Sequence, residues 1–108
     1  MVGEQTSTGW ISKAADAFQV LGNEARLRLV LLLAQQMSGE RYRLDELAQM
    51  LGAPASVISL HLGVLENAGI VHRDRRDGQV CYSLDRKGLL AYGDLIYDLL
   101  AKGAYLLA

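Results

Sequence analysis

The segment Leu44–Leu84 constrains the fold more than any other part of the chain, because helix, turn and strand signals follow one another closely there. It reads LDELAQMLGAPASVISLHLGVLENAGIVHRDRRDGQVCYSL. Apolar spacing predicts a short helix over Leu44–Leu51 and a second helix over about Ala55–Ala68. The tight turn between them is Gly52–Pro54, since a proline at a helix start needs no amide donor and has its φ already set.

A hairpin is predicted directly after the second helix. Ile70–Arg75 and Gln79–Leu84 read as two strands around Asp77-Gly78, and Asp-Gly is the strongest short hairpin signal. This order predicts a winged helix-turn-helix, with the helix-turn-helix over residues 44–68 and the wing over residues 70–84. Because such an arrangement places its second helix in a DNA groove, we expect a regulator of transcription that binds double-stranded DNA.

The rest of the chain completes a single domain that is mainly α-helical. A chain of 108 residues is one domain, and we expect residues 1–9 to be flexible and residues 10–108 to be folded. Further helices are predicted over residues 10–21, from the N-cap Asn23 to about Met37, and over residues 86–107. The helix after Asn23 is apolar nearly all round, which is typical of a buried helix. The predicted fold therefore has five helices and a two-stranded hairpin.

Composition narrows the setting and the class of function. The net charge is −1, so any DNA site must be a local basic patch. No secretory signal is visible and Leu29–Ala34 is too short to span a bilayer, so we expect a cytoplasmic protein without a membrane partner. Its one cysteine, Cys81, excludes an intrachain disulfide and a site with two thiolates from one chain. With no catalytic Ser/His/Asp order and no Gly-rich phosphate loop, we do not expect an enzyme.

The second helix of the helix-turn-helix divides into two faces. At about 100° per residue, Ile58, Leu62 and Leu65 fall together as the core face. The opposite face, which is either a DNA-reading surface or an ordinary solvated one, consists of Ser56, Ser59, Leu60, Gly63 and Asn67.

The side chains of this reading face suggest different contacts. Ser59 and Asn67 can hydrogen-bond phosphates or base edges, and Leu60 can meet a thymine methyl. His61 lies between the two faces and either binds a phosphate or packs within the domain. No arginine or lysine stands on the reading face.

The wing supplies the positive charge that this helix lacks. Arg73, Arg75 and Arg76 cluster around the hairpin turn, and Gln79 is assigned to the same surface. A wing with arginines typically lies along the DNA backbone or enters the minor groove. The alternative is a hairpin that neutralises itself through Asp74 and Asp77, two acidic residues among the arginines.

Four segments of the chain resemble the ArsR/SmtB repressors, a family of small dimeric winged-helix proteins. They are LGNEARLRLVLLLA (21–34), LDELAQMLG (44–52), SVISLHLGVLENAGIV (56–71) and RRDGQVCYSL (75–84). The resemblance covers about residues 18–97. It implies an obligate dimer through the first and last helices (10–21 and 86–107), a pseudo-palindromic operator, and release of DNA when an inducer binds or a thiol is modified.

Apolar residues on the two terminal helices agree with dimerisation. They offer more apolar surface than a small monomer needs, and a pair of terminal helices is a natural place to bury it. The alternative is that they complete the core of the monomer. The residues assigned to the interface are Trp10, Phe18, Tyr92, Ile96, Leu99 and Leu100.

The chain departs from the family at its usual metal sites. The resemblance aligns Arg43 and Asp45 with the family's Cys-x-Cys pair. It aligns a second ligand set with Arg86, Gly88, Leu99 and Lys102. Cationic arginine and aliphatic leucine do not ligate a divalent cation. The sequence is therefore identified as a member of a non-metal branch, without a cofactor.

The recognition helix departs from the family as well. Where the family often has serine, glutamine, arginine and lysine, this chain has Pro54, Ala55, Leu60 and Gly63. Direct readout by bidentate arginine or glutamine is therefore missing. Either serines, apolar contacts and DNA shape give specificity, or the chain is a winged-helix protein-interaction module with weak DNA binding.

Two signals remain candidates for releasing the DNA. Cys81 on the second wing strand is the candidate redox residue, although it is also explained as a small strand residue without chemistry. A small-molecule inducer in an aromatic-lined pocket between the dimer helices is the other. The sequence thus predicts a dimeric repressor controlled by a non-metal signal, with the interaction module as the alternative.

Overall fold

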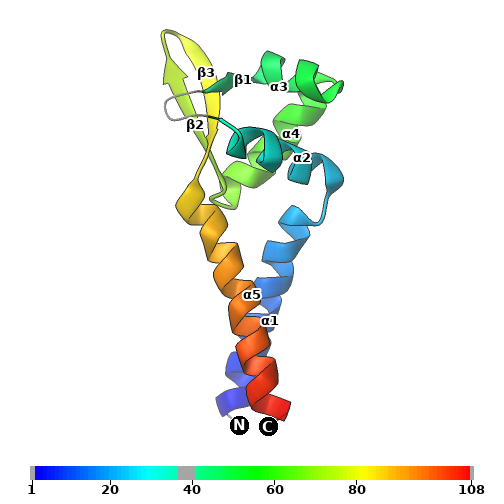
Figure 1. Ribbon diagram of the computed structural model, residues 1–108, viewed down its shortest axis with the longest axis vertical. Helices are drawn as coiled ribbons and strands as arrows, with labels where there is room; N and C mark the ends of the chain where they lie inside the picture. The colour runs from blue at the N-terminus through cyan, green and yellow to red at the C-terminus, as the bar shows by residue number, and fades with distance from the viewer. Residues whose placement is uncertain (1, 37–40, 108) are drawn as a thin grey trace.

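The computed structural model describes the backbone of residues 2–36 and 41–107, and the side chains of residue 9 and of residues 11–36 and 41–101. Helices α2, α3 and α4 and a three-stranded sheet form a body, from which two helical arms, α1 and α5, extend (Figure 1). In chain order the elements are α1 (Val2–Leu21), α2 (Glu24–Ala34), β1 (Tyr42–Arg43), α3 (Leu44–Leu51), α4 (Ala55–Asn67), β2 (Val71–Arg76), β3 (Gln79–Leu84) and α5 (Arg86–Leu107).

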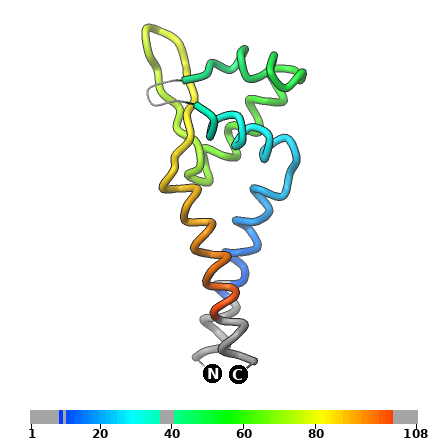
Figure 2. The backbone as a smooth tube through the Cα atoms, in the orientation of Figure 1, coloured from blue at the N-terminus to red at the C-terminus, as the bar shows by residue number. Residues whose placement is uncertain are grey.

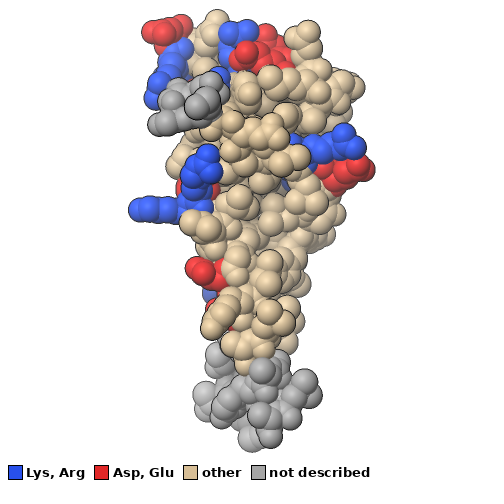
Figure 3. Space-filling model, in the orientation of Figure 1, with Lys and Arg blue, Asp and Glu red and all other residues tan. Residues whose placement is uncertain are grey.

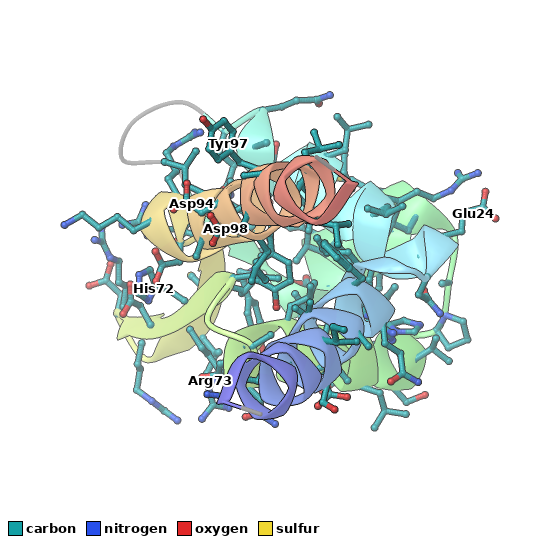
Figure 4. All side chains as sticks on the ribbon, turned by 90° about the horizontal axis from the view of Figure 1, so that it is seen from below. Glu24, His72, Arg73, Asp94, Tyr97 and Asp98 are labelled. Atoms are coloured by element: carbon teal, nitrogen blue, oxygen red, sulfur yellow. The ribbon has the colours of Figure 1, made fainter. Side chains whose placement is uncertain are left out.

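The arms make the molecule long. It measures 53 × 26 × 20 Å, and its radius of gyration is 16.7 Å, whereas a compact domain of this length has a radius of about 13 Å. The wing, formed by β2 and β3, projects from the end opposite the arms (Figure 2). The two arms cross in Figure 1, but Figure 4, which looks along them, shows them apart. The two helices nevertheless contact each other within the chain.

One apolar core holds the body together. Its fully buried side chains come from α2, α3, α4 and the segment before β2, and they are Leu29, Leu33, Leu47, Ile58, Leu62, Leu65 and Ile70. Removing each such side chain from water stabilises the fold by about 1.5–3 kcal/mol. Since α4 contributes Ile58, Leu62 and Leu65, one face of α4 is fixed inward and the opposite face is turned outward.

The helix-turn-helix is confirmed, with α4 ending at Asn67 instead of Ala68. The axes of α3 and α4 bend by 110° at the turn, an angle typical of this motif. Gly52 ends α3 with a φ of 63°, a left-handed conformation that glycine adopts without a steric penalty. Pro54, with a φ of −60°, precedes the first turn of α4.

The sheet has three strands in the order β1-β3-β2, so the predicted two-stranded hairpin was incomplete. The hairpin itself is confirmed, because Arg76 pairs with Gln79 and both turn residues, Asp77 and Gly78, have positive φ. In addition, β1 pairs with the edge of β3 that faces away from β2, and Arg43 lies opposite Cys81. A strand of two residues is too short to show the alternation of polar and apolar residues that predicts strands. Strand β1 forms because its backbone pairs with β3, which is distant in the sequence.

Helices α2 and α1 differ from their predicted form. Helix α2 is not buried all round: Leu27 is 50% exposed and Leu31 is 60% exposed, on the side away from the core. Apolar spacing identifies such residues but not whether a neighbour covers them. Helix α2 ends at Ala34, and Met37, its predicted end, lies outside the described residues.

Helix α1 begins at Val2 rather than near residue 10, because its first residues carry no apolar stripe that periodicity would detect. Residues 1–9 are expected from the sequence to be flexible. This expectation falls mainly on residue 1 and the side chains of residues 2–8, which lie outside the described residues.

Arg26, at the start of α2, joins three helices. Its backbone N–H donates to Oδ1 of Asn23 at 3.1 Å, so Asn23 caps α2 as predicted. Its guanidinium donates from Nη2 to the carbonyl of Gln19 at 3.1 Å and from Nε to the carbonyl of Val20, both at the end of α1. Nη1 lies 3.3 Å from Nδ1 of His61 on α4. One side chain thus ties the α1 arm to the body.

Gly88 determines where α5 leaves the body. A Cβ added there would lie 1.6 Å from the carbonyl oxygen of Gly69, in the turn between α4 and β2. The backbone N–H of Gly88 also donates to Oδ1 of Asp85 at 3.0 Å, at the start of α5. The first turn of α5 therefore packs directly on the backbone that follows α4, and only a residue without a side chain fits.

No single helix in the described ranges is long and apolar enough to cross a membrane, and α3 with α4 reaches that length only as a pair bent by 110°.

We expect Arg26→Lys to destabilise the fold by about 1–2 kcal/mol, because one ammonium cannot reach all three acceptors that the guanidinium contacts. The matched control is Arg28→Lys, since among the described residues Arg28 pairs with the exposed Glu24 alone, at 2.8 Å, and such pairs contribute about 0.2–1 kcal/mol. Urea denaturation measures both variants. Equal losses of stability would show that the contacts of Arg26 with α1 and α4 contribute nothing.

We expect Gly88→Ala to destabilise the fold by about 1–3 kcal/mol, because the new methyl group displaces the backbone at Gly69. Gly93→Ala is the control on the same helix. An added Cβ there meets nothing within 4 Å, so better helix propensity should stabilise α5 by about 0.5–1 kcal/mol. Thermal unfolding followed by circular dichroism compares the two, and a stabilised Gly88→Ala would contradict the close approach.

Candidate nucleic-acid interface

The outward face of α4 is the face that the helical wheel selects. Ile58, Leu62 and Leu65 are buried as predicted. On the opposite side Ser56, Ser59, Leu60 and Asn67 are exposed, and Gly63 is half-buried. These five residues form what is called the reading face below.

The surface around the reading face is more apolar than the helical wheel indicates. Leu60 is 72% exposed, and Val57 and Val64 on the same helix are exposed as well. Met50 on α3 is also exposed. Their exposure shows that the interior of this chain does not use them. Helical spacing alone missed the valines because they flank the reading face rather than lie at its centre.

His61 has a partner inside the protein. It is half-buried, and its Nδ1 faces Nη1 of Arg26 at 3.3 Å. A guanidinium offers only donors. In this contact Nδ1 of His61 therefore serves as the acceptor. The sequence left two roles open for His61. The contact with Arg26 supports the first, packing within the domain, and the second, a phosphate contact through Nε2, stays a prediction.

The wing presents two arginines whose charge is not neutralised within the described part of the chain. Arg75 and Arg76 are exposed and form no ion pair with any other described residue. Asp74, which would neutralise them in the alternative interpretation, instead has its Oδ2 3.8 Å from Nε of Arg41. Arg73 differs, because its Nε lies 3.8 Å from Glu66 on α4 and links the wing to that helix. The wing therefore does not neutralise itself, and its positive charge is concentrated at Arg75 and Arg76.

Charged side chains gather over the body and are sparse on the visible side of the arms (Figure 3). In Figure 4, His72 and Arg73 lie on the wing, to the side of both arms. Nε2 of His72 lies 3.2 Å from Oδ2 of Asp85, so His72 contacts the residue that precedes α5. The wing thus carries a local basic patch, and further exposed cations, Arg86 and Lys87, lie at the start of α5.

Arg43 and Asp45, the positions that the resemblance aligns with the family's Cys-x-Cys pair, form an ion pair. Nε of Arg43 donates to Oδ1 of Asp45 at 3.1 Å, and the backbone N–H of Arg43 donates to Glu46 at 2.9 Å. The hydrogen bond from Arg43 lowers the pKa of the Asp45 carboxyl, and Asp45 in turn raises the pKa of Arg43. Within the described ranges, no three or more His, Cys, Asp or Glu residues are grouped so that they could hold a metal ion. Cys81 is a free, half-buried thiol on β3.

The residues predicted for a dimer interface fall into different environments. Ile96, Leu99 and Leu100 on α5 are exposed, and Phe18 on α1 is half-buried. Tyr92 is only 8% exposed and belongs to the core of a single chain, where burial raises its pKa. Tyr92 therefore offers little surface to a partner, contrary to the prediction. The side chain of Trp10 lies outside the described residues.

Comparison with known proteins agrees with this architecture. A family model described as bacterial regulatory protein, arsR family, matches residues 23–73. No curated protein sequence matches the chain significantly. Among solved structures, the transcriptional repressor BigR from Xylella fastidiosa is 26% identical with a TM-score of 0.66, covering 92% of this chain and 95% of BigR.

Two further structures show the same fold. The homodimeric winged helix-turn-helix domain Mb0332 from Mycobacterium bovis is 20% identical with a TM-score of 0.65, and the match covers 88% of this chain and 83% of that one. A possible transcriptional regulator for arsenical resistance is 32% identical with a TM-score of 0.67, covering 78% of this chain and 83% of that one. The chain therefore belongs to the arsR family of bacterial regulatory proteins, which are transcriptional regulators with a winged helix-turn-helix fold and not enzymes.

Proposed function

We propose that this protein is a dimeric repressor that binds a pseudo-palindromic operator. The observation that carries the proposal is the presence of two surfaces on one body: an outward face of α4 that the core leaves free, and Arg75 and Arg76 of the wing, which pair with no other described residue. Helix α4 enters the major groove with the reading face toward the base edges. The wing arginines contact phosphates and hold the protein on the duplex. The similar repressor BigR supports repression rather than activation.

Dimerisation through the arms follows from their exposed apolar side chains. A monomer leaves this surface in water, whereas a second copy placed along the arms covers it. A two-fold dimer also presents two copies of α4, so its operator has two half-sites about one helical turn apart. Homodimeric Mb0332 shares the fold. The exposed apolar side chains of the arms are Ile11, Leu90, Ile96, Tyr97, Leu99 and Leu100.

The signal that releases DNA is proposed to be something other than a metal. An arginine bound to an aspartate at the Cys-x-Cys positions cannot supply two soft ligands to a cation. Two alternatives remain: modification of the Cys81 thiol, or a small-molecule inducer between the arms. We place this regulation in the cytoplasm.

A protein-interaction module is the second candidate. The exposed Leu60 and the absence of lysine and arginine from α4 favour it, since both suit a protein surface. Anisotropy titrations with DNA from upstream of the protein's own gene and with random DNA, each at two salt concentrations, separate the candidates. Tighter, salt-dependent binding to the upstream DNA supports the repressor. Equal and weak binding to both supports the interaction module.

Replacing both Arg75 and Arg76 with alanine should weaken binding to every duplex. For each phosphate that an arginine no longer neutralises, fewer counterions are released, so the slope of log K against log salt concentration becomes shallower by about 0.9. Titrations over a series of salt concentrations measure this slope. Lys13→Ala, on the exposed surface of the α1 arm, is the control and should leave it unchanged. An unaltered slope in the double variant would remove the wing from the interface.

Leu100→Asp should convert the dimer to monomer. An unpaired carboxylate buried between the arms costs several kcal/mol, so the dissociation constant of the dimer should rise by about a hundredfold or more. Leu60→Asp is the matched control, because Leu60 is as exposed as Leu100 but lies on α4. Sedimentation velocity measures both, and a Leu100→Asp protein that stays dimeric would place the interface elsewhere.

A further inference from the structure

A large apolar side chain occupies the centre of the reading face. Leu60 lies almost diametrically opposite the core residues Ile58 and Leu62 when α4 is viewed along its axis. It is the most exposed of the large apolar side chains on α4, at 72%. It therefore points directly at whatever α4 docks against.

The surroundings of Leu60 offer apolar contact and close approach rather than charge. Val64 and Val57 lie on one side of it and Ser56 and Asn67 on the other, and α4 contains no lysine, arginine or glutamine. A Cβ added to Gly63 would meet nothing within 4 Å, so packing inside the chain does not require a glycine there. A glycine beside Leu60 instead allows the helix backbone to come close to a ligand.

We propose that Leu60 reads the C5-methyl group of thymine, so that thymine methyls set the base preference of each half-site. This rests on the proposed DNA-binding function. In the major groove the bases present hydrogen-bond donors and acceptors, and thymine alone adds a methyl group. A leucine that covers a donor or acceptor removes that group from water without replacing its hydrogen bond, which costs free energy. A leucine that covers a methyl group instead buries apolar surface of both the leucine and the thymine.

The charge around this site favours DNA over a protein partner as the occupant. The same body carries Arg75 and Arg76 without ion pairs to other described residues, which matches a polyanion. Ser56 and Asn67 flank Leu60 with short polar side chains that suit base edges or phosphates. An apolar centre with short polar neighbours and a separate cationic wing thus fits a duplex whose reading depends on a methyl group.

The test uses thymidine and deoxyuridine, two nucleosides that differ only in this methyl group. Duplexes that bind the protein are first selected from a random library, and the selected sequence is then synthesised with thymine throughout and with deoxyuridine throughout. We expect the deoxyuridine duplex to bind about fourfold more weakly for each half-site contacted, the effect of removing one methyl-sized group from the interface. Fluorescence anisotropy gives both dissociation constants.

Two variants assign the effect to Leu60. For Leu60→Ala the two duplexes should bind equally, since alanine is too short to touch the methyl. Because Leu60 is exposed, this change leaves the core intact. Ser59→Ala, one residue away on the same face, is the matched control: loss of its hydroxyl weakens binding to both duplexes by the same factor where Ser59 contacts DNA, and the ratio between the thymidine and deoxyuridine duplexes should stay unchanged.

The outcomes separate this inference from the proposed function. Loss of the thymine preference in Leu60→Ala alone supports it. A selected sequence that binds tightly, but equally with thymine and deoxyuridine, overturns the inference and leaves the repressor standing. The same holds if Leu60→Ala keeps the full preference. A selection that enriches no sequence overturns the proposed function and this inference together, and makes Leu60 a contact for another protein.

Discussion

The burial of one face of α4 is the interaction on which the rest of the structure depends. Ile58, Leu62 and Leu65 fill the core between α2, α3 and the sheet. Shifting α4 forward by one residue, a turn of about 100°, would replace these three side chains in the core with Ser59, Gly63 and Glu66, and so bury a hydroxyl and a carboxylate. The core therefore fixes which side chains of α4 face outward. Leu60 is exposed because it lies on the side of the helix opposite the buried residues. In the proposed complex with DNA, packing at the inner face of α4 thus decides which side chains of its outer face meet the bases.

Two contacts then fix the arms to this helix. Arg26 holds the end of α1 against α2 and touches His61 on α4, while Gly88 seats α5 on the backbone that follows α4. In both contacts a backbone carbonyl, that of Gln19 or that of Gly69, is one of the two partners. Neither contact can therefore change its geometry unless a helix moves. In the proposed dimer the arms meet their counterparts, and the angle at which they leave the body sets the distance between the two copies of α4. The contacts of Arg26 and Gly88 are thus part of what determines half-site spacing.

Local features could be predicted from the sequence, and features that need a distant partner could not. The turn at Gly52, the hairpin at Asp77-Gly78 and the cap at Asn23 each depend on residues within a few positions of one another. Strand β1 exists only because β3 lies beside it. The reading face followed from helical spacing, yet the pairing of Asp74 with Arg41 and the burial of Tyr92 within one chain did not.

Affinity and base preference are assigned to different elements in this proposal. Arginines on a recognition helix usually contribute to both affinity and base preference. One guanidinium hydrogen-bonds to guanine, and its charge also attracts the phosphates in a way that weakens with added salt. Here Arg75 and Arg76, two cations without ion pairs to other described residues, are on the wing, and α4 carries no lysine or arginine. Phosphate contacts of the wing carry no sequence information and weaken with salt, whereas burial of a methyl by Leu60 releases no counterions. Added salt should therefore loosen the protein from all DNA alike, while the ratio between preferred and other sequences is governed by α4 alone.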